Sequence, residues 1–436
     1  MKTNRLLTAL LAAGMLLPIL GGCAANPEPA EADPSAAEET EEIPVFVEYS
    51  ASSLSSASPV EGEAMSGAFV RASSAFGFEM LGRTAKEGNV MVSPVSVLYA
   101  LGMTSLGSAN NTRAQMEKTL FGGISVEEAA KYFRGFADNL PNTEKAKLTV
   151  ANSIWLNQLA GRFSVNAQFL SDNTSWYGAD VFGLPFDMDA LNRVNGWISD
   201  KTDKMIPKML DDISADALMM LVNTVLFDAK WQTEYNKYQV SEQDFTSYDG
   251  TVTKRETLSS SEWQYITLGK GAGFIKPYAE KYSFVGILPN EGEDVFKYAA
   301  SIDGKAFVDA VTNPSREKVQ VRIPTFTFDY GTELSGVLSD MGMSDAFSGS
   351  KADFSKMGEC SDGGNIHISR VLHKTRIELT PSGTKAAAAT VVEMKATSAM
   401  PTQKPKQIYL DRPFVFAIIE NETGLPVFCG VVSELK

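Results

Sequence analysis

The chain has 436 residues, of which 44% are hydrophobic and 10% aromatic, and its formal net charge is −14. This composition supplies enough apolar side chains for a sizeable core and is not that of a fibrous or repeat protein. The acidic balance and the lack of any basic cluster in the sequence argue against binding to nucleic acid.

Residues 1–22 have the pattern of a secretory signal peptide. Lys2 and Arg5 give a positive start, and the apolar run that follows, Leu6 to Leu20, is too short to span a bilayer comfortably. The run ends in Leu20-Gly21-Gly22-Cys23, which resembles a bacterial lipobox, where small residues precede a cysteine that becomes the lipidated N-terminus. The alternative is an ordinary signal peptide followed by a chance cysteine. We expect a lipidated Cys23 and an extracytoplasmic protein anchored to a bacterial membrane, at the cell surface or on a periplasmic face.

The segment after Cys23 is rich in Ala, Glu, Pro and Ser. Residues 24–70 hold ten acidic residues and no Lys or Arg. Because the whole chain carries −14 and the signal peptide +2, the part from Arg71 onward carries only −6. The segment lacks the apolar side chains needed for a core, so we expect a disordered, self-repelling acidic tether over 23–65 and one folded domain over 66–436.

Two further cysteines, Cys360 and Cys429, lie in the expected domain. Nothing in their spacing demands a disulfide, so free thiols are expected.

Periodicity places helices early in the domain and strands mostly later. Helical spacing is expected at Phe76–Leu81, Ser96–Leu106 and Leu191–Thr202. Strands are expected from the composition at Asn89–Ser93, Leu148–Leu156, Ala217–Trp231, Phe274–Pro277, Ser283–Pro289, Lys318–Pro324, Ile366–Leu379 and Phe414–Glu420. This distribution predicts an α+β fold with large sheets.

The usual enzyme motifs are missing from the sequence. There is no G-x-S-x-G elbow, H-E-x-x-H helix or G-x-x-x-x-G-K-[ST] loop. The only histidines, His367 and His373, are predicted on one strand, on the same face but about 20 Å apart, which is too far for one metal ion. His373 is expected to be a buried, hydrogen-bonded histidine. We expect neither a catalytic site nor a metal or cofactor.

A series of short motifs, in order along the chain, resembles the serpin family of protease inhibitors. The series is Asn89-Val90-Met91-Val92-Ser93-Pro94-Val95-Ser96, Leu106-Gly107, Thr112, Ala151-Asn152-Ser153-Ile154-Trp155, Asn195-Gly196-Trp197-Ile198, Ile206-Pro207, Leu221-Val222-Asn223-Thr224, Lys230-Trp231, Gly342-Met343, Asp345-Ala346-Phe347, Ala352-Asp353-Phe354 and Arg412-Pro413-Phe414. The resemblance extends from about Phe69 to the C-terminus. It implies a fold of three β-sheets and about nine helices, with an exposed reactive loop near the C-terminus.

The resemblance also assigns roles to particular residues. A polar cluster beneath the main sheet would consist of Ser93, Ser96, Asn223 and His373, acting as a latch that opens when the loop inserts; simple satisfaction of buried polar groups is the alternative. Trp231 would lie where loop insertion begins, although a packed core tryptophan is an equally ordinary account.

The expected reactive loop extends from Gly383 to Ser398. Gly383 would serve as the hinge glycine, within a hinge segment made of Gly383, Thr384, Lys385, Ala386, Ala387, Ala388, Ala389 and Thr390. If Thr384 points inward, the alternate positions that follow it to Met394 are all small or apolar, whereas every charge lies on the other face. Such a segment can be a half-buried strand or an exposed loop. In isolation, an alanine-rich loop or helix is equally compatible with it.

The function that the resemblance implies is suicide inhibition of serine or cysteine proteases by cleavage and insertion of the loop. The family's hinge-to-bond spacing favours cleavage at Thr397–Ser398, with Lys395–Ala396 and Met394–Lys395 as alternatives. The expected partners are a target protease and a membrane, with no nucleic acid, and we expect a monomer. Pro381 departs from the family pattern, which has Glu there, and a non-inhibitory serpin that is a protease substrate or binding module is the alternative function.

Overall fold

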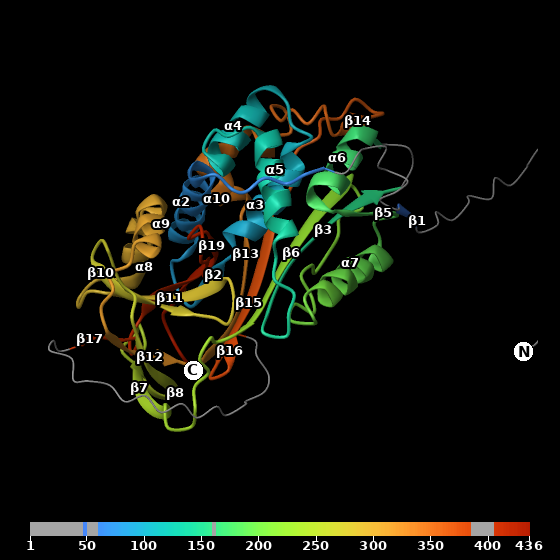
Figure 1. Ribbon diagram of the computed structural model, residues 1–436. Coiled ribbons are helices and arrows are strands. Elements are labelled where there is room, and N and C mark those ends of the chain that lie inside the picture. The colour runs from blue at the N-terminus through green and yellow to red at the C-terminus, as the bar shows by residue number, and fades with distance from the viewer. Residues whose placement is uncertain (1–46, 50–59, 159–162, 385–404) are drawn as a thin grey trace, which may run out of the picture. The chain divides into compact units, whose positions relative to one another are not determined.

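Seven strands form the main sheet of the computed structural model, which describes residues 47–49, 60–158, 163–384 and 405–436 (Figure 1). In spatial order they are β1 (Val47–Tyr49), β5 (Asp180–Leu184), β3 (Ala146–Asn157), β6 (Met219–Lys230), β16 (Gly383–Thr384), β15 (Leu372–Thr380) and β13 (Phe326–Glu333). The short strand β16 lies between the long strands β6 and β15 and is antiparallel to both.

Two further large sheets complete the β structure. The second sheet has the order β2 (Val90–Val92), β19 (Pro426–Val432), β18 (Phe414–Glu420), β11 (Tyr282–Pro289), β10 (Gly271–Pro277) and β9 (Tyr265–Leu268). The third sheet has the order β17 (Lys406–Tyr409), β12 (Val319–Pro324), β8 (Val252–Glu262) and β7 (Val240–Thr246). A two-stranded pair, β14 (Gly358–Cys360) with β4 (Phe163–Val165), adds to the three sheets that were expected.

The helices are concentrated in the first half of the fold, as predicted. They are α2 (Gly67–Thr84), α3 (Pro94–Ser105), α4 (Asn110–Phe121), α5 (Val126–Asp138), α6 (Ala167–Tyr177), α7 (Met188–Lys201), α8 (Val295–Ser301), α9 (Gly304–Thr312), α10 (Ser335–Leu338), a π-helical turn (Ser339–Met343) and a 3₁₀ turn (Ser344–Phe347). Side-chain caps explain several starts: Ser66 caps α2, and Ser93, followed by Pro94 at the first helical position, caps α3. The α+β prediction is confirmed.

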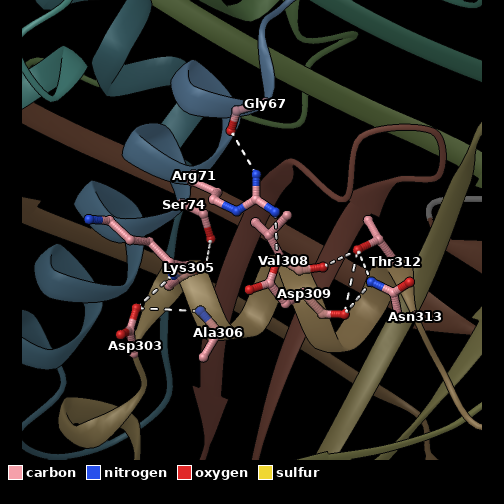
Figure 2. Close-up of polar contacts among 11 residues, drawn as sticks. Gly67, Arg71, Ser74, Asp303, Lys305, Ala306, Val308, Asp309, Thr312 and Asn313 are labelled. Carbon is pink, nitrogen blue, oxygen red and sulfur yellow. Dashed lines mark hydrogen bonds and ion pairs between the residues drawn. The ribbon is translucent and has the colours of Figure 1, made fainter.

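Helix α2 packs against α9, although more than two hundred residues separate them in the chain. Figure 2 shows Arg71 of α2 reaching Asp309 of α9, where the guanidinium and carboxylate lie 2.7 Å apart. Deeper in the interface, the buried hydroxyl of Ser74 donates a hydrogen bond of 2.7 Å to the carbonyl of Gly304. Gly304 has no room for a side chain, because a Cβ atom there would lie 2.3 Å from the Ser74 carbonyl oxygen. These contacts tie the first helix of the domain to the second half of the chain.

The expected disordered tether over 23–65 needs correction at Val47–Tyr49. These residues form β1, which pairs antiparallel with Val181–Gly183 of β5. The physical reason is that the outer edge of β5 offers unpaired backbone groups, and Val and Tyr favour an extended conformation. Nearer the domain, the amide of Glu63 donates to the carbonyl of Lys131 at 3.0 Å, so ordered contacts begin before residue 66.

Strand β15 begins only at Leu372, so the prediction of a strand from Ile366 is wrong for the residues before Leu372. Residues before it make other contacts: the amide of Ile368 donates to the carbonyl of Ala346 at 2.9 Å. His367 therefore lies outside the strand and is exposed, and the prediction that both histidines share one strand face is wrong.

Within the described ranges, no helix is long and apolar enough to cross a membrane, and no group of three His, Cys, Asp or Glu side chains is placed to hold a metal ion. Cys429 is a buried free thiol, and so it forms no disulfide with Cys360.

Candidate functional site

The expected hinge forms a tight turn that returns the chain from β15 into β16. Thr380 pairs with Gly383 across this turn, and Pro381 and Ser382 form its two corners. Proline suits the first corner of such a turn, because its fixed φ fits there and no ladder hydrogen bond is needed from it. Pro381 therefore lies in the turn and outside the ladder.

Gly383 is required by its backbone conformation and by lack of space. Its φ is +152°, which L side chains rarely adopt, and a Cβ atom there would lie 2.1 Å from the carbonyl oxygen of Ala229 in β6.

We expect Gly383→Ala to displace β16 from the main sheet. An unfavourable φ alone costs about 1–3 kcal/mol, and the chain can relieve the clash by withdrawing these two residues. Urea denaturation should show that the free energy of unfolding falls by about 1–3 kcal/mol. The control is Gly196→Ala on α7, where nothing lies within 4 Å of the added methyl group, and a gain of about 0.5–1 kcal/mol is expected. Equal stability of the Gly383→Ala variant and the native protein would contradict the prediction.

Thr384 is the first residue whose side chain enters the gap between the long strands. It is 3% exposed, and it pairs with Ala229 of β6 and with Leu379 of β15. Its hydroxyl lies 2.6 Å from the hydroxyl of Tyr278, so the two groups share a buried hydrogen bond. The side chain therefore points into the core.

Trp231 holds the hinge turn from the β6 side. Its indole Nε1 donates to the carbonyl of Thr380 at 3.0 Å, and its backbone amide donates to the carbonyl of Ser382 at 2.9 Å. The indole is 2% exposed and stacks on Tyr278, with ring centroids 4.4 Å apart and an interplanar angle of 4°. Trp231 thus combines core packing with direct bonds to the hinge.

From the residues that pair with Thr384 back toward the start of each strand, β6 and β15 run side by side (Figure 1). In the part of the chain that the structure describes, these two strands do not pair with each other. A cavity of about 410 Å³ lies along this gap, lined by residues 218–223 on the β6 side and 366–374 on the β15 side, with part of α3 beneath it. We call this gap the insertion slot. Its two walls are the two strands that flank β16.

The four residues of the expected polar cluster form two pairs around the start of α3. The backbone amide of Ser93 donates to Nε2 of His373 at 3.0 Å, and the hydroxyl of Ser96 donates to Oδ1 of Asn223 at 2.5 Å. The amide of Ser96 donates to the hydroxyl of Ser93 at 3.1 Å, which links the pairs. Among the described residues, no side-chain hydrogen bond joins Asn223 directly to His373, so each slot wall is bonded separately to α3.

Burial keeps His373 neutral. The ring is fully enclosed, which lowers its pKa to about 4. A neutral ring is also required by its geometry, because Nε2 accepts the Ser93 amide and therefore carries no proton.

This pKa predicts a stability loss in mild acid. The unfolded chain gains the histidine proton near pH 6.5, whereas the folded protein gains it only near pH 4. The contribution of His373 to stability is thus fully present above pH 6.5, falls by about 3 kcal/mol between pH 6.5 and pH 4, and is constant below. Urea denaturation across this range should show a shallower pH dependence for His373→Gln. A pH dependence of His373→Gln identical to that of the native protein would contradict the prediction.

Several contacting residues were not predicted from the sequence. Tyr278 binds Thr384, Asn152 accepts a hydrogen bond of 2.8 Å from Asn223, and the amide of Tyr235 donates to the carbonyl of Pro381 at 3.2 Å. Only Asn152 carried a sequence signal, because it falls in the Ala151–Trp155 motif.

Other predicted site residues lie outside the described ones. These are the lipidation site Cys23, the hinge residues Lys385, Ala386, Ala387, Ala388, Ala389 and Thr390, and the bond residues Met394, Lys395, Ala396, Thr397 and Ser398.

A family model described as serpin (serine protease inhibitor) matches residues 71–435. The chain belongs to the serpin family. Among serpins, it is 28% identical over 376 residues to an uncharacterized serpin-like protein of Thermococcus kodakarensis, covering 84% of this chain and 86% of that protein. It is 29% identical over 378 residues to leukocyte elastase inhibitor A of Rattus norvegicus, covering 81% and 95% of the two chains.

Solved serpin structures share the fold, which confirms the serpin architecture that was expected. The native state of the thermophilic serpin tengpin aligns with a TM-score of 0.81 at 41% identity, covering 87% of this chain and 97% of tengpin. The latent state of tengpin aligns with a TM-score of 0.76 at 38% identity, covering 86% and 100%.

Proposed function

We propose that this serpin is a suicide inhibitor of serine or cysteine proteases, which traps the protease covalently when its reactive loop is cleaved and inserts into the main sheet. The observation that carries the proposal is the position of β16. Gly383 and Thr384 already lie between β6 and β15, antiparallel to both. An inserting loop would extend this short strand and would not need to find a new place in the sheet.

The register of β16 says where further loop residues would go. Each step forward along the loop is a step back along β6 and along β15, from the pairs of Thr384 with Ala229 and Leu379. Six residues on, Thr390 would lie between Asn223 and His373, which are the slot-wall members of the polar cluster. Thr390 has a hydroxyl that can donate and accept, so it is suited to this polar position.

The chemistry would be supplied by the protease. Its catalytic Ser or Cys attacks the carbonyl carbon of Thr397, forming an ester or thioester, and the amide nitrogen of Ser398 leaves as a new amine. Insertion of about 14 residues would then carry the attached protease about 50 Å. At about 1 kcal/mol net for each newly paired residue, insertion would release on the order of 10 kcal/mol, enough to distort an active site that depends on narrow geometry. Hydrolysis of the acyl bond would then stop.

The relatives support this proposal in two ways. The rat relative is named as an elastase inhibitor, and tengpin has been solved in both a native and a latent state. A second state in a structural relative at 38% identity fits a fold whose native form is kinetically trapped.

The test is to incubate the purified domain with trypsin, elastase, subtilisin and a papain-like protease, and then to run denaturing gels. A covalent complex that survives denaturation supports inhibition, whereas clean cleavage in every case rejects it. Mass spectrometry of the released C-terminal peptide identifies the bond. We propose Thr397–Ser398, with Lys395–Ala396 and Met394–Lys395 as the alternatives.

The second candidate function is a non-inhibitory serpin, cleaved as a substrate or acting as a binding module. Pro381, in place of the family's Glu, is the feature that favours it. Because Pro381 lies at a turn corner and removes no ladder hydrogen bond, inhibition remains the preferred proposal.

We further propose that Cys23 carries a lipid that anchors the inhibitor to a bacterial membrane, on its extracytoplasmic side. The sequence pattern around Cys23 is the support for this proposal. Membrane fractionation of cells that express the full chain should place the native protein with membranes and Cys23→Ser in the soluble fraction. Equal membrane association of both would reject the lipid anchor.

A further inference from the structure

A cleft of about 880 Å³ lies between the second and third sheets, away from the insertion slot. Its walls come from the end of β8, from β10, β11 and β18, and from the loop that follows Trp231. The volume falls within the range of about 300–1,000 Å³ that is usual for small-molecule sites. The cleft takes no part in the inhibitory mechanism proposed above.

The floor of the cleft holds a buried ion pair. The ammonium of Lys276 lies 3.2 Å from Oε1 of Glu262, and the two side chains are only 4% and 12% exposed. The hydroxyl of Ser260 donates to the same oxygen at 2.6 Å. The other carboxylate oxygen, Oε2, has no hydrogen-bond partner among the described residues. The floor therefore has balanced charge but keeps an acceptor for a ligand's hydroxyl group.

This balance limits the charge of the ligand. An anion at the floor would be repelled by Glu262, and a cation would be repelled by Lys276. The Lys276 ammonium also makes cation–π contacts with Tyr235 and Trp231, whose ring centroids lie 4.5 Å and 5.2 Å away. Removing a charged ligand from water is costly unless the site supplies an opposite charge. A neutral ligand avoids this cost.

The rest of the lining combines polar side chains with the aliphatic side chains of Ile275, Pro277, Val311 and Ile419, and the exposed guanidinium of Arg316 lies at the rim with an aromatic ring. Gln264 and Ser283 line the cleft, and their side chains make no hydrogen bond within the described part of the fold. Trp263 also lines it and is 64% exposed, which is unusual for such a large apolar side chain. Amides and hydroxyls favour a ligand with many hydroxyl groups. The ammonium of Lys318 lies over one face of the Trp263 indole, 5.9 Å from the ring centroid, so a sugar ring would stack on the opposite face.

We propose that this cleft binds a short uncharged oligosaccharide. One sugar ring stacks on Trp263, and its neighbour donates a hydroxyl to Oε2 of Glu262 and exchanges hydrogen bonds with Gln264 and Ser283. The proposal does not depend on protease inhibition, because it requires no movement of the loop.

The test uses the full-length protein and three neutral probes, maltotriose, cellotriose and chitotriose, in titration calorimetry at millimolar concentrations. At least one trisaccharide should bind. Trp263→Ala should weaken that binding at least about fivefold, as expected for loss of a stacking contact. Gln264→Ala, as a separate variant, should also weaken it. Both positions are exposed, so neither change should affect folding.

The matched control is Tyr248→Ala, which removes another exposed aromatic side chain, 55% exposed, that does not line the cleft. It should bind the trisaccharide as the native protein does. Failure of all three probes to bind the native protein would overturn the proposal, as would binding that both cleft variants leave unchanged. Binding of citrate at this cleft, lost in Trp263→Ala, in place of the sugars would overturn the assignment to an uncharged ligand.

Discussion

Replacing Thr384 by arginine should convert the protein from an inhibitor into a protease substrate. The Thr384 side chain is buried between Ala229 and Leu379, and its hydroxyl bonds to Tyr278. A guanidinium there would lose its hydration without gaining a carboxylate partner, which costs several kcal/mol. The arginine would therefore displace β16 from the main sheet, so insertion would lose its starting strand and the acyl-enzyme would hydrolyse before the protease is distorted.

Denaturing gels with a protease that the native protein traps should show at least about a tenfold loss of covalent complex, together with full cleavage of the loop. Thr384→Ser is the matched control, because it keeps the hydroxyl for Tyr278 and adds no bulk, and it should retain the complex. Undiminished trapping by Thr384→Arg would exclude insertion along the register of β16.

Replacing Trp231 by alanine should lower the free energy of unfolding more than Gly383→Ala does. The indole is 2% exposed, stacks on Tyr278 and donates to the carbonyl of Thr380. Removing a buried aromatic side chain of this size costs about 3–5 kcal/mol. The carbonyl of Thr380 also loses its partner, so the hinge turn should loosen along with the core.

Urea denaturation at neutral pH measures this loss, and the exposed Trp263 provides a control with the same chemical change. Trp263→Ala should alter the free energy of unfolding by no more than about 0.5 kcal/mol. Similar losses for the two variants would show that Trp231 contributes little beyond its exposed counterpart and would refute its role as an anchor of the hinge.

Local sequence pattern was a good guide where a segment buries its own side chains. The sequence predicts a strand at Phe414–Glu420, which is β18 with the same bounds. It also predicts a strand at Ala217–Trp231, which begins two residues before β6 and ends one residue after it. Both are largely apolar segments with β-branched and aromatic side chains, a composition typical of buried strands. The order of family motifs then supplied the topology, which periodicity alone does not contain.

Contacts between distant segments could not be predicted in this way. Tyr278 and Thr384 are 106 residues apart, and nothing local to either marks the other as its partner. The strand β15 begins later than its composition indicated, because Ile368 bonds to Ala346 instead of continuing a ladder. Likewise, β1 depends on a free edge of β5 that exists only in the folded sheet.

The two-residue strand β16 has a consequence for the kinetics of insertion. The slow part of adding a strand to a sheet is the first contact, because the loop must be closed against its own entropy before any pairing rewards it. In this protein the turn at Pro381 and the pairs at Gly383 and Thr384 are already formed in the folded state. Nucleation of the proposed insertion would therefore precede the arrival of a protease. Insertion after cleavage would proceed as elongation, one residue at a time, and its rate would be governed by the parting of the slot walls.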